Sequence, residues 1–183
     1  MADRNLNAAS LIRRGALACV LLLLALCQAV AEDAKPLRGV ALIIGNGEYE
    51  HLTRLPNPDG DASAIEDLFD DLGFETFDAR DADARKLRRA IERFVEDAEG
   101  ADVAVLYYAG HGIEAGGENY LVPTDADISA LDDAGEKLVP LTALLADLRA
   151  AVPMTIILLD ACRDNPFPPG AMVRAAPDAE PVS

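Results

Sequence analysis

Short apolar runs alternate along residues 40–159 with segments whose apolar residues recur at helical spacing, and turn residues separate the two. The apolar runs predict four strands, at Val40–Ile44, Phe74–Phe77, Val103–Tyr108 and Met154–Leu159. Helices are predicted at Ala62–Leu72, from a cap at Asp81 or Asp83 to about Ala98, and at Leu141–Leu148, and a small hairpin at Ile113–Val122. This alternation is typical of an α/β fold with a mostly parallel sheet of about four core strands flanked by helices.

The carboxyl ends of the third and fourth predicted strands carry the candidate chemistry. The third strand is apolar throughout, which indicates burial on both faces, and it leads into Gly110-His111-Gly112. The fourth leads into Asp160-Ala161-Cys162. Ligands of open parallel sheets bind beyond these strand ends. If the two strands are neighbours, about 5 Å apart, the side chains of His111 and Cys162 can face each other.

Residues 1–31 have the pattern of a secretory signal peptide. Arg13 and Arg14 precede an apolar stretch that ends in small residues before Glu32, so we expect cleavage after Ala31. An uncleaved anchor, a twin-arginine route and lipidation are the alternatives. The pattern predicts an exported, periplasmic or secreted protein with no membrane attachment after cleavage.

Cleavage would change the cysteine content of the chain. Cys19 and Cys27 leave with the signal peptide, so Cys162 is the one cysteine of the exported chain and no internal disulfide can form. Residues 32–167 suit a single domain that rests on its apolar core. Residues 168–183 are rich in proline and alanine, and their composition predicts a disordered tail.

The chain is strongly acidic, with 16 basic and 32 acidic residues and a net charge of −16. Three basic residues and one acidic residue lie in the signal peptide, so the exported chain has 13 basic and 31 acidic residues, a net charge of −18. Such a surface repels phosphate backbones and anionic lipids and attracts basic peptides, polyamines or divalent cations. The charge argues against nucleic acid as a partner, and solubility accounts for most of the acidic residues.

His111 and Cys162 together fit nucleophilic catalysis. A free thiol is mostly protonated near neutral pH, and a neighbouring imidazole promotes the thiolate that attacks a carbonyl carbon. The glycines on both sides of His111 allow a sharp turn and a close approach of substrate to the backbone N–H of Gly112. Each residue alone has a plainer interpretation, because a cysteine that ends a buried strand ordinarily packs in the core and a histidine between glycines ordinarily lies in a turn.

Two motifs in this order resemble a known family. Tyr107-Tyr108-Ala109-Gly110-His111-Gly112 and Asp160-Ala161-Cys162-Arg163-Asp164 are similar to the large-subunit (p20) region of caspase-like cysteine peptidases, in particular the bacterial metacaspase-like branch. The segments 41–46 and 55–58 also resemble that branch, so the resemblance covers residues 38–167. The separation of 51 residues between the histidine and the cysteine matches the caspase pattern. The resemblance implies a three-layer caspase-like fold.

The same resemblance implies cysteine endopeptidase activity. By this analogy Cys162 attacks the peptide carbonyl and His111 protonates the leaving amine and then activates water. The backbone N–H groups of Gly112 and Cys162 would form the oxyanion hole. Asp160 matches an acid that lines the first specificity pocket of metacaspases, and Asp61 matches a second. Two carboxylates there would select arginine or lysine before the cleaved bond, so the implied partners are protein or peptide substrates that are basic at the cleavage site.

The acids and tyrosines of these motifs also have structural interpretations. Asp160 at a strand end can hydrogen-bond loop amides, and Asp61 can cap a helix. Tyr107 and Tyr108 are expected to pack at the end of their strand.

This chemistry requires no cofactor, but the resemblance makes calcium a candidate ligand. Asp125, Asp132 and Asp133 occupy positions that resemble the calcium-binding acids of some metacaspases, whereas calcium prefers six or more oxygen ligands. Structural zinc is disfavoured by one cysteine and two histidines. A dinucleotide loop at Gly45-Asn46-Gly47 is rejected because Glu50 replaces its third glycine.

Caspase-like domains continue past the nucleophile into a small-subunit region with two further strands, whereas this chain extends 21 residues past Cys162. We therefore expect a sheet that lacks the small-subunit strands and an exposed fourth strand that a partner can pair with. The alternative to a peptidase is a catalytically silent caspase-like module that acts in binding or assembly. An unrelated thiol hydrolase is a third hypothesis.

Overall fold

A computed structural model describes residues 35–127, 131–161, 166–169 and 172–174. The account below concerns the compact unit Leu37–Ser183. The predicted signal peptide lies outside the described residues and stays a prediction. Among the residues that are described, no helix is long and apolar enough to cross a membrane.

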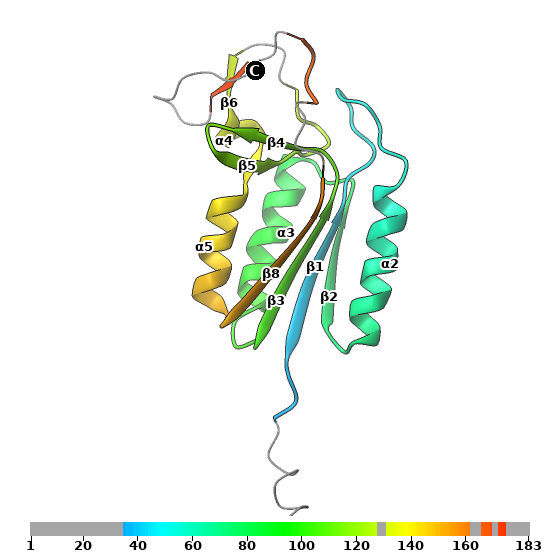
Figure 1. Cartoon of the computed structure of the whole chain (residues 1–183), viewed down its shortest axis with the longest axis vertical. Coiled ribbons are helices and arrows are strands. Elements are labelled where there is room, and N and C mark those ends of the chain that lie inside the picture. The colour runs from blue at the N-terminus through cyan, green and yellow to red at the C-terminus, as the bar shows by residue number, and fades with distance from the viewer. Residues whose placement is uncertain (1–34, 128–130, 162–165, 170–171, 175–183) are drawn as a thin grey trace, which may run out of the picture. The chain divides into compact units, whose positions relative to one another are not determined.

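Four parallel strands form the main sheet: β1 (Gly39–Gly45), β2 (Glu75–Arg80), β3 (Val103–Ala109) and β8 (Met154–Asp160). Their order across the sheet is β2-β1-β3-β8 (Figure 1). β1 and β3 occupy the centre, and every residue of both is buried. The prediction of four parallel strands is confirmed, and the third and fourth strands are neighbours, which is the condition for His111 and Cys162 to face each other.

Helices cover both faces of this sheet, which gives three layers (Figure 1). On one face lies α2 (Pro58–Asp71), and on the other lie α3 (Ala84–Asp97) and α5 (Leu141–Ala151). Side chains alternate between the two faces because the side-chain period of a strand is two residues. Leu42 of β1 therefore packs in the core beneath α3 and α5, whereas Ile43 packs in the core beneath α2. The predicted three-layer α/β fold is confirmed.

Three elements differ from their predicted bounds by three or more residues, and one of them is α5, which continues past Leu148 to Ala151. α2 begins at Pro58 rather than Ala62, because proline at the first helical position has a φ that suits a helix and lacks only an N–H that would be unbonded there. β2 continues past Phe77 to Arg80, because its polar last residues still pair with β1. α3 begins as predicted, with Asp83 as its N-cap and the carboxylate of that residue accepting a hydrogen bond from the backbone N–H of Lys86.

β8 is less buried than its apolar sequence predicts. It lies at the edge of the sheet, and α2 packs over β1, β2 and β3 and leaves the end of that face uncovered. Met154 is 55% exposed and Ile156 and Leu158 are each 39% exposed. An apolar run alone cannot distinguish a central strand from an edge strand with one apolar face in solvent. No further strand pairs with β8 within the described part of the chain.

The predicted hairpin is present as β4 (Gly112–Ala115) and β5 (Glu118–Leu121), which pair antiparallel. Gly116 and Gly117 join them with φ of 61° and 81°, a turn that favours glycine at both positions. The remaining short elements are β6 (Leu131–Asp133), α4 (Ala134–Lys137), β7 (Val139–Pro140) and β9 (Met172–Arg174).

β9 falls within the segment 168–183 for which composition predicts a disordered tail. It pairs in parallel with β6, and Val173 is buried. Met172 and Val173 are apolar residues that can pack even within a proline- and alanine-rich segment, and the predicted disorder of the tail stays a prediction.

Candidate active site

A cavity of about 410 Å³ opens at the carboxyl ends of β3 and β8. Its walls come from the loop and first turn of α2, from the end of β3 and from the end of β8. The lining residues are Leu55, Pro56, Asn57, Pro58, Asp61, Ala109, Gly110, His111, Asp160 and Pro166. The cavity therefore lies where open parallel sheets bind ligands, and it contains three of the predicted site residues.

The register of β3 and β8 relates the two predicted catalytic residues. Ala109, the last residue of β3, pairs with Asp160, the last residue of β8. His111 follows the first of these by two residues and Cys162 follows the second by two. Cys162 itself lies outside the described residues.

The His111 imidazole is held from two sides. Its Nε2 lies 2.8 Å from the backbone carbonyl oxygen of Thr53, and its ring centroid lies 4.6 Å from that of Tyr49. A carbonyl oxygen only accepts hydrogen bonds, so this contact assigns the ring hydrogen to Nε2 when the imidazole is neutral. Nδ1 is then the ring nitrogen with a lone pair for proton transfer.

The backbone of His111 is held by two tyrosine hydroxyls. The N–H of His111 donates a hydrogen bond of 2.8 Å to the hydroxyl of Tyr49, and the hydroxyl of Tyr108 donates one of 2.6 Å to the carbonyl of His111. The two hydroxyls lie 3.4 Å apart, and the N–H of Val122 donates to the hydroxyl of Tyr108. Tyr108 is fully buried. These contacts fix the turn that presents the imidazole.

Burial keeps both hydroxyls protonated. It raises the pKa of Tyr49 above its ordinary value of 10, although the hydrogen bonds with Tyr108 and His111 lower it in part. Burial raises the pKa of Tyr108 well above 10, and the neighbouring Tyr49 raises it further. Both groups therefore remain neutral hydrogen-bonding groups near neutral pH.

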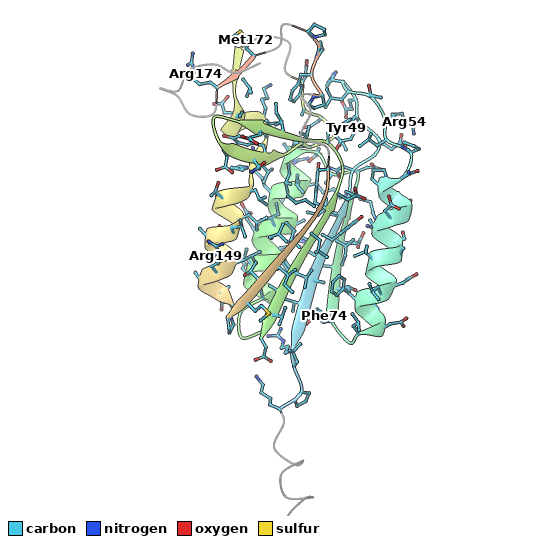
Figure 2. The ribbon with its side chains drawn as sticks, viewed as in Figure 1. Tyr49, Arg54, Phe74, Arg149, Met172 and Arg174 are labelled. Carbon is cyan, nitrogen blue, oxygen red and sulfur yellow. The ribbon has the colours of Figure 1, made fainter. Side chains whose placement is uncertain are left out.

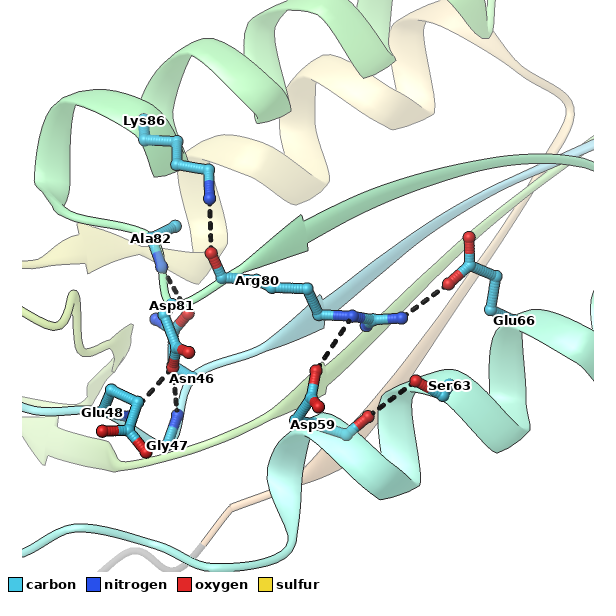
Figure 3. A network of polar contacts seen from close by, with 10 residues as sticks. All are labelled: Asn46, Gly47, Glu48, Asp59, Ser63, Glu66, Arg80, Asp81, Ala82 and Lys86. Atoms are coloured by element: carbon cyan, nitrogen blue, oxygen red, sulfur yellow. Dashed lines mark hydrogen bonds and ion pairs between the residues drawn. The ribbon is translucent and has the colours of Figure 1, made fainter.

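The loop after β1 carries Tyr49 and the carbonyl of Thr53, and two side chains hold its base (Figures 2 and 3). The carboxylate of Asp81 accepts hydrogen bonds of 2.9 Å from the N–H groups of Gly47 and Glu48. The buried Asn46 accepts one from the N–H of Ala82 and lies 3.3 Å from the carbonyl of Val122 through its amide nitrogen. The loop is thus anchored to residues 81 and 82, which follow β2, and to Val122, which follows β5.

Two carboxylates lie at the cavity, and the charges of both affect the pKa of Tyr107. Asp160 is the last residue of β8, and Asp61 lies in the first turn of α2, so each reaches the cavity from a different element. Burial raises the pKa of Tyr107 above 10, and the negative charges of Asp160 and Asp61 raise it further. Asp61 is not the cap of α2, because Asn57 occupies that position. The two predicted specificity residues are therefore brought together at one site.

Gly110 is required by the close approach of the two hydroxyls. A Cβ at this position would lie 2.7 Å from the hydroxyl oxygens of both Tyr49 and Tyr108. Gly112, the predicted oxyanion residue, is the first residue of β4 and follows His111 directly.

The candidate calcium residues have separate positions. The Asp125 carboxylate accepts a hydrogen bond of 2.8 Å from the N–H of Ala84, the first residue of α3. Asp132 and Asp133 belong to β6, whose side chains are not described. The described side chains include no group of three or more histidine, cysteine, aspartate or glutamate residues that could hold a metal ion. Calcium binding stays a prediction.

Four residues of this site were not predicted from the sequence: Asn46, Tyr49, Thr53 and the functional position of Tyr108. Tyr108 did carry a signal, because a tyrosine in an otherwise aliphatic buried strand needs a hydrogen-bond partner for its hydroxyl. Thr53 carried none, since it contributes its backbone carbonyl.

Parts of this chain are similar in sequence to known proteins. A family model for the caspase domain matches residues 38–180. The mucosa-associated lymphoid tissue lymphoma translocation protein 1 of Homo sapiens is 34% identical over 87 residues, which are 48% of this chain and 11% of that protein. Caspase-1 of Felis catus is 28% identical over 117 residues, which are 58% of this chain and 28% of that protein. The chain thus spans well under half the length of these relatives.

Proposed function

Because this chain belongs to the caspase domain family of cysteine peptidases, we propose that it is a cysteine endopeptidase in which His111 and Cys162 act as the catalytic pair. The observation that carries the proposal is the register of the two strands. Ala109 lies opposite Asp160, and the histidine and the cysteine each follow by two residues. Chain segments that leave neighbouring strands at the same height begin about 5 Å apart, within reach of a thiol and an imidazole.

The contacts of His111 support different roles for its two ring nitrogens. With Nε2–H bonded to the carbonyl of Thr53, Nδ1 takes the thiol proton of Cys162. The thiolate attacks the carbonyl carbon, and the N–H groups of Gly112 and Cys162 stabilise the oxyanion. Nδ1–H then protonates the leaving amine, which leaves a thioester, and the neutral imidazole deprotonates the water that hydrolyses it.

The charge of the cavity favours a basic residue before the cleaved bond. Asp61 and Asp160 place two carboxylates at a cavity of about 410 Å³ that is otherwise lined largely by apolar and uncharged residues. An arginine side chain can pair with two carboxylates through its planar set of donors, whereas an aspartate side chain would be repelled. The proposed substrates are therefore proteins or peptides with arginine or lysine at this position.

Fluorogenic peptides that end in arginine, lysine or aspartate test this proposal directly. The full chain is incubated with each peptide, with and without calcium, and beside the variants Cys162→Ala and His111→Ala. We expect release after arginine or lysine by the natural chain alone, and covalent labelling of Cys162 by an electrophilic peptide that ends in arginine. Cleavage confined to aspartate would overturn the acidic pocket, and absence of both turnover and labelling would overturn the peptidase.

One observation favours a second function, a binding or assembly module. β8 is an edge strand whose apolar side chains Met154, Ile156 and Leu158 are exposed, a surface that a partner chain can cover. A chain that forms a stoichiometric complex through this edge while Cys162 remains unlabelled would favour the module over the enzyme.

A further inference from the structure

α3 concentrates positive charge on a strongly acidic protein. The helix contains five of the 16 basic residues of the chain, which has a net charge of −16. They are Arg85, Lys86, Arg88, Arg89 and Arg93. α2, on the opposite face of the sheet, has acidic residues but no basic one. With its three acidic residues, Glu92, Glu96 and Asp97, α3 has a net charge of 5 − 3 = +2, so the positive charge is local to this helix.

Three of these cations converge on one groove beside β2. Lys86, Arg89 and Arg93 are exposed and follow one another at helical spacing, so they lie along one side of α3. With Asp78, Ala79 and Ala90 they line a groove of about 260 Å³. The two alanines leave the space between helix and strand open. Asp78 also borders the groove, but it lies in β2 between Phe77 and Ala79, whose side chains face α3, so strand alternation directs its carboxylate to the opposite face of the sheet.

The groove runs along a free strand edge. β2 is the outermost strand of the sheet and pairs with β1 alone within the described residues, so its other side has N–H and C=O groups with no strand partner there. The ammonium group of Lys86 donates to the carbonyl of Arg80 at the end of β2, which keeps this lysine at the strand (Figure 3). Among the described residues, neither Arg89 nor Arg93 has a side-chain hydrogen bond or an ion pair.

We propose that this groove binds an acidic protein segment in an extended conformation. The segment adds to the free edge of β2 through its main chain, and its carboxylates pair with Lys86, Arg89 and Arg93. Strand addition supplies main-chain hydrogen bonds, and the row of cations supplies the preference for acidic side chains. A nucleic acid or a membrane offers no strand to pair with β2, and the acidic remainder of the surface repels both.

This surface is separate from the proposed catalytic site, so its test does not depend on peptidase activity. A fluorescent eight-residue peptide with alternating aspartate and valine is titrated against the full chain, and binding is followed by fluorescence anisotropy at low and high salt. The test variant is Arg89→Glu, and the matched control is Arg149→Glu, which makes the same charge change on an exposed arginine of the neighbouring helix α5 (Figure 2). Circular dichroism verifies that both variants fold.

We expect Arg89→Glu to raise the dissociation constant about tenfold, as loss of a charge-assisted hydrogen bond would, and Arg149→Glu to change it little. A peptide N-methylated at alternate residues should bind with at least a tenfold higher dissociation constant, because it cannot pair with a strand edge. Equal weakening by the two arginine variants would overturn the proposal, as would undiminished binding of the N-methylated peptide. Binding of polyadenylate or of phosphatidylglycerol vesicles as tightly as the acidic peptide would also overturn it.

Discussion

The hydroxyl of Tyr108 donates a hydrogen bond of 2.6 Å to the backbone carbonyl of His111, three residues further along the chain. Tyr108 points into the core beneath α3, and the imidazole three residues later lies at the cavity. The buried side chain therefore fixes the turn from inside, and the position of His111 depends on the packing of the sheet.

Tyr108→Phe should affect the position of the His111 imidazole without affecting substrate binding. Removal of the hydroxyl leaves the carbonyl of His111 without this donor, so we expect a loss of about 1–3 kcal/mol in the free energy of unfolding. The proposed role of His111 predicts that the turnover number falls about tenfold with little change in KM, because the imidazole is misplaced while the two carboxylates of the proposed specificity pocket are unchanged. Steady-state kinetics and urea denaturation measure the two effects.

The neighbouring Tyr107 provides the comparison for that variant. Its hydroxyl is near Asp160 and Asp61 rather than His111, so Tyr107→Phe should change KM for arginine substrates more than the turnover number. If both phenylalanine variants changed the same kinetic constant by the same factor, the positioning role of Tyr108 would be rejected.

Stability at alkaline pH should depend on Tyr108. Burial and Tyr49 raise the pKa of Tyr108 in the folded state above its unfolded value of about 10. As the pH rises past about 10, the unfolded chain loses this proton first, which favours unfolding. The contribution of Tyr108 to stability is therefore complete below that pH and is lost as the pH rises through the folded-state pKa.

Urea denaturation at pH 8 and at about pH 11 tests this dependence. The free energy of unfolding of the natural chain should fall over this interval, and that of Tyr108→Phe should fall less. Tyr49 contributes in the same direction, since its pKa is also raised. An equal fall in the two proteins would show that Tyr108 does not carry the effect.

The strands of the sheet and the residues at its carboxyl edge were predicted better than the loop and the hydrogen bonds that hold His111. The four strands and their parallel arrangement follow from period and topology rules, whereas the strand order and the pairing of β3 with β8 came from the structure. His111, Asp160 and Asp61 do reach one cavity. The edge position of β8 did not follow, because apolar character alone does not reveal which neighbours cover a strand.

The polar contacts around His111 could not be predicted from one sequence. Tyr49 approaches the histidine across 62 residues, and its loop is positioned by hydrogen bonds to Asp81, a residue expected only as a helix cap. Asp81 has a φ of 44°, a backbone conformation that is uncommon for a residue other than glycine. Long-range contacts between loops leave no periodic pattern along the chain.

Removal of charge from the cavity should lower selectivity for arginine. Asp160→Asn keeps the size of the side chain but removes one carboxylate, so kcat/KM for an arginine peptide should fall about 10- to 100-fold. A peptide with citrulline, the neutral analogue of arginine, should be affected little, and Asp61→Asn should act in the same direction. The ratio of the two kcat/KM values measures the preference directly.

An independent titration verifies that the substituted carboxylate faces the cavity. Since the charge of Asp160 raises the pKa of Tyr107, Asp160→Asn should lower the pKa at which that tyrosine ionises, as seen by ultraviolet absorbance. An unchanged titration together with unchanged selectivity would remove Asp160 from the specificity pocket.

Gly110→Ala should disrupt the site from its backbone. The added Cβ would lie 2.7 Å from the hydroxyls of Tyr49 and Tyr108, and neither ring can move without losing its contact with His111. We expect a loss of about 1–3 kcal/mol in the free energy of unfolding, together with a loss of turnover.

Gly60→Ala is the matched control, because Gly60 lies in α2 with no atom within 4 Å of an added Cβ. That variant should gain about 0.5–1 kcal/mol from higher helix propensity and keep its activity. Thermal unfolding and peptide turnover are measured for the two variants. A Gly110→Ala protein as active as Gly60→Ala would mean that the hydroxyls of Tyr49 and Tyr108 do not determine where His111 lies.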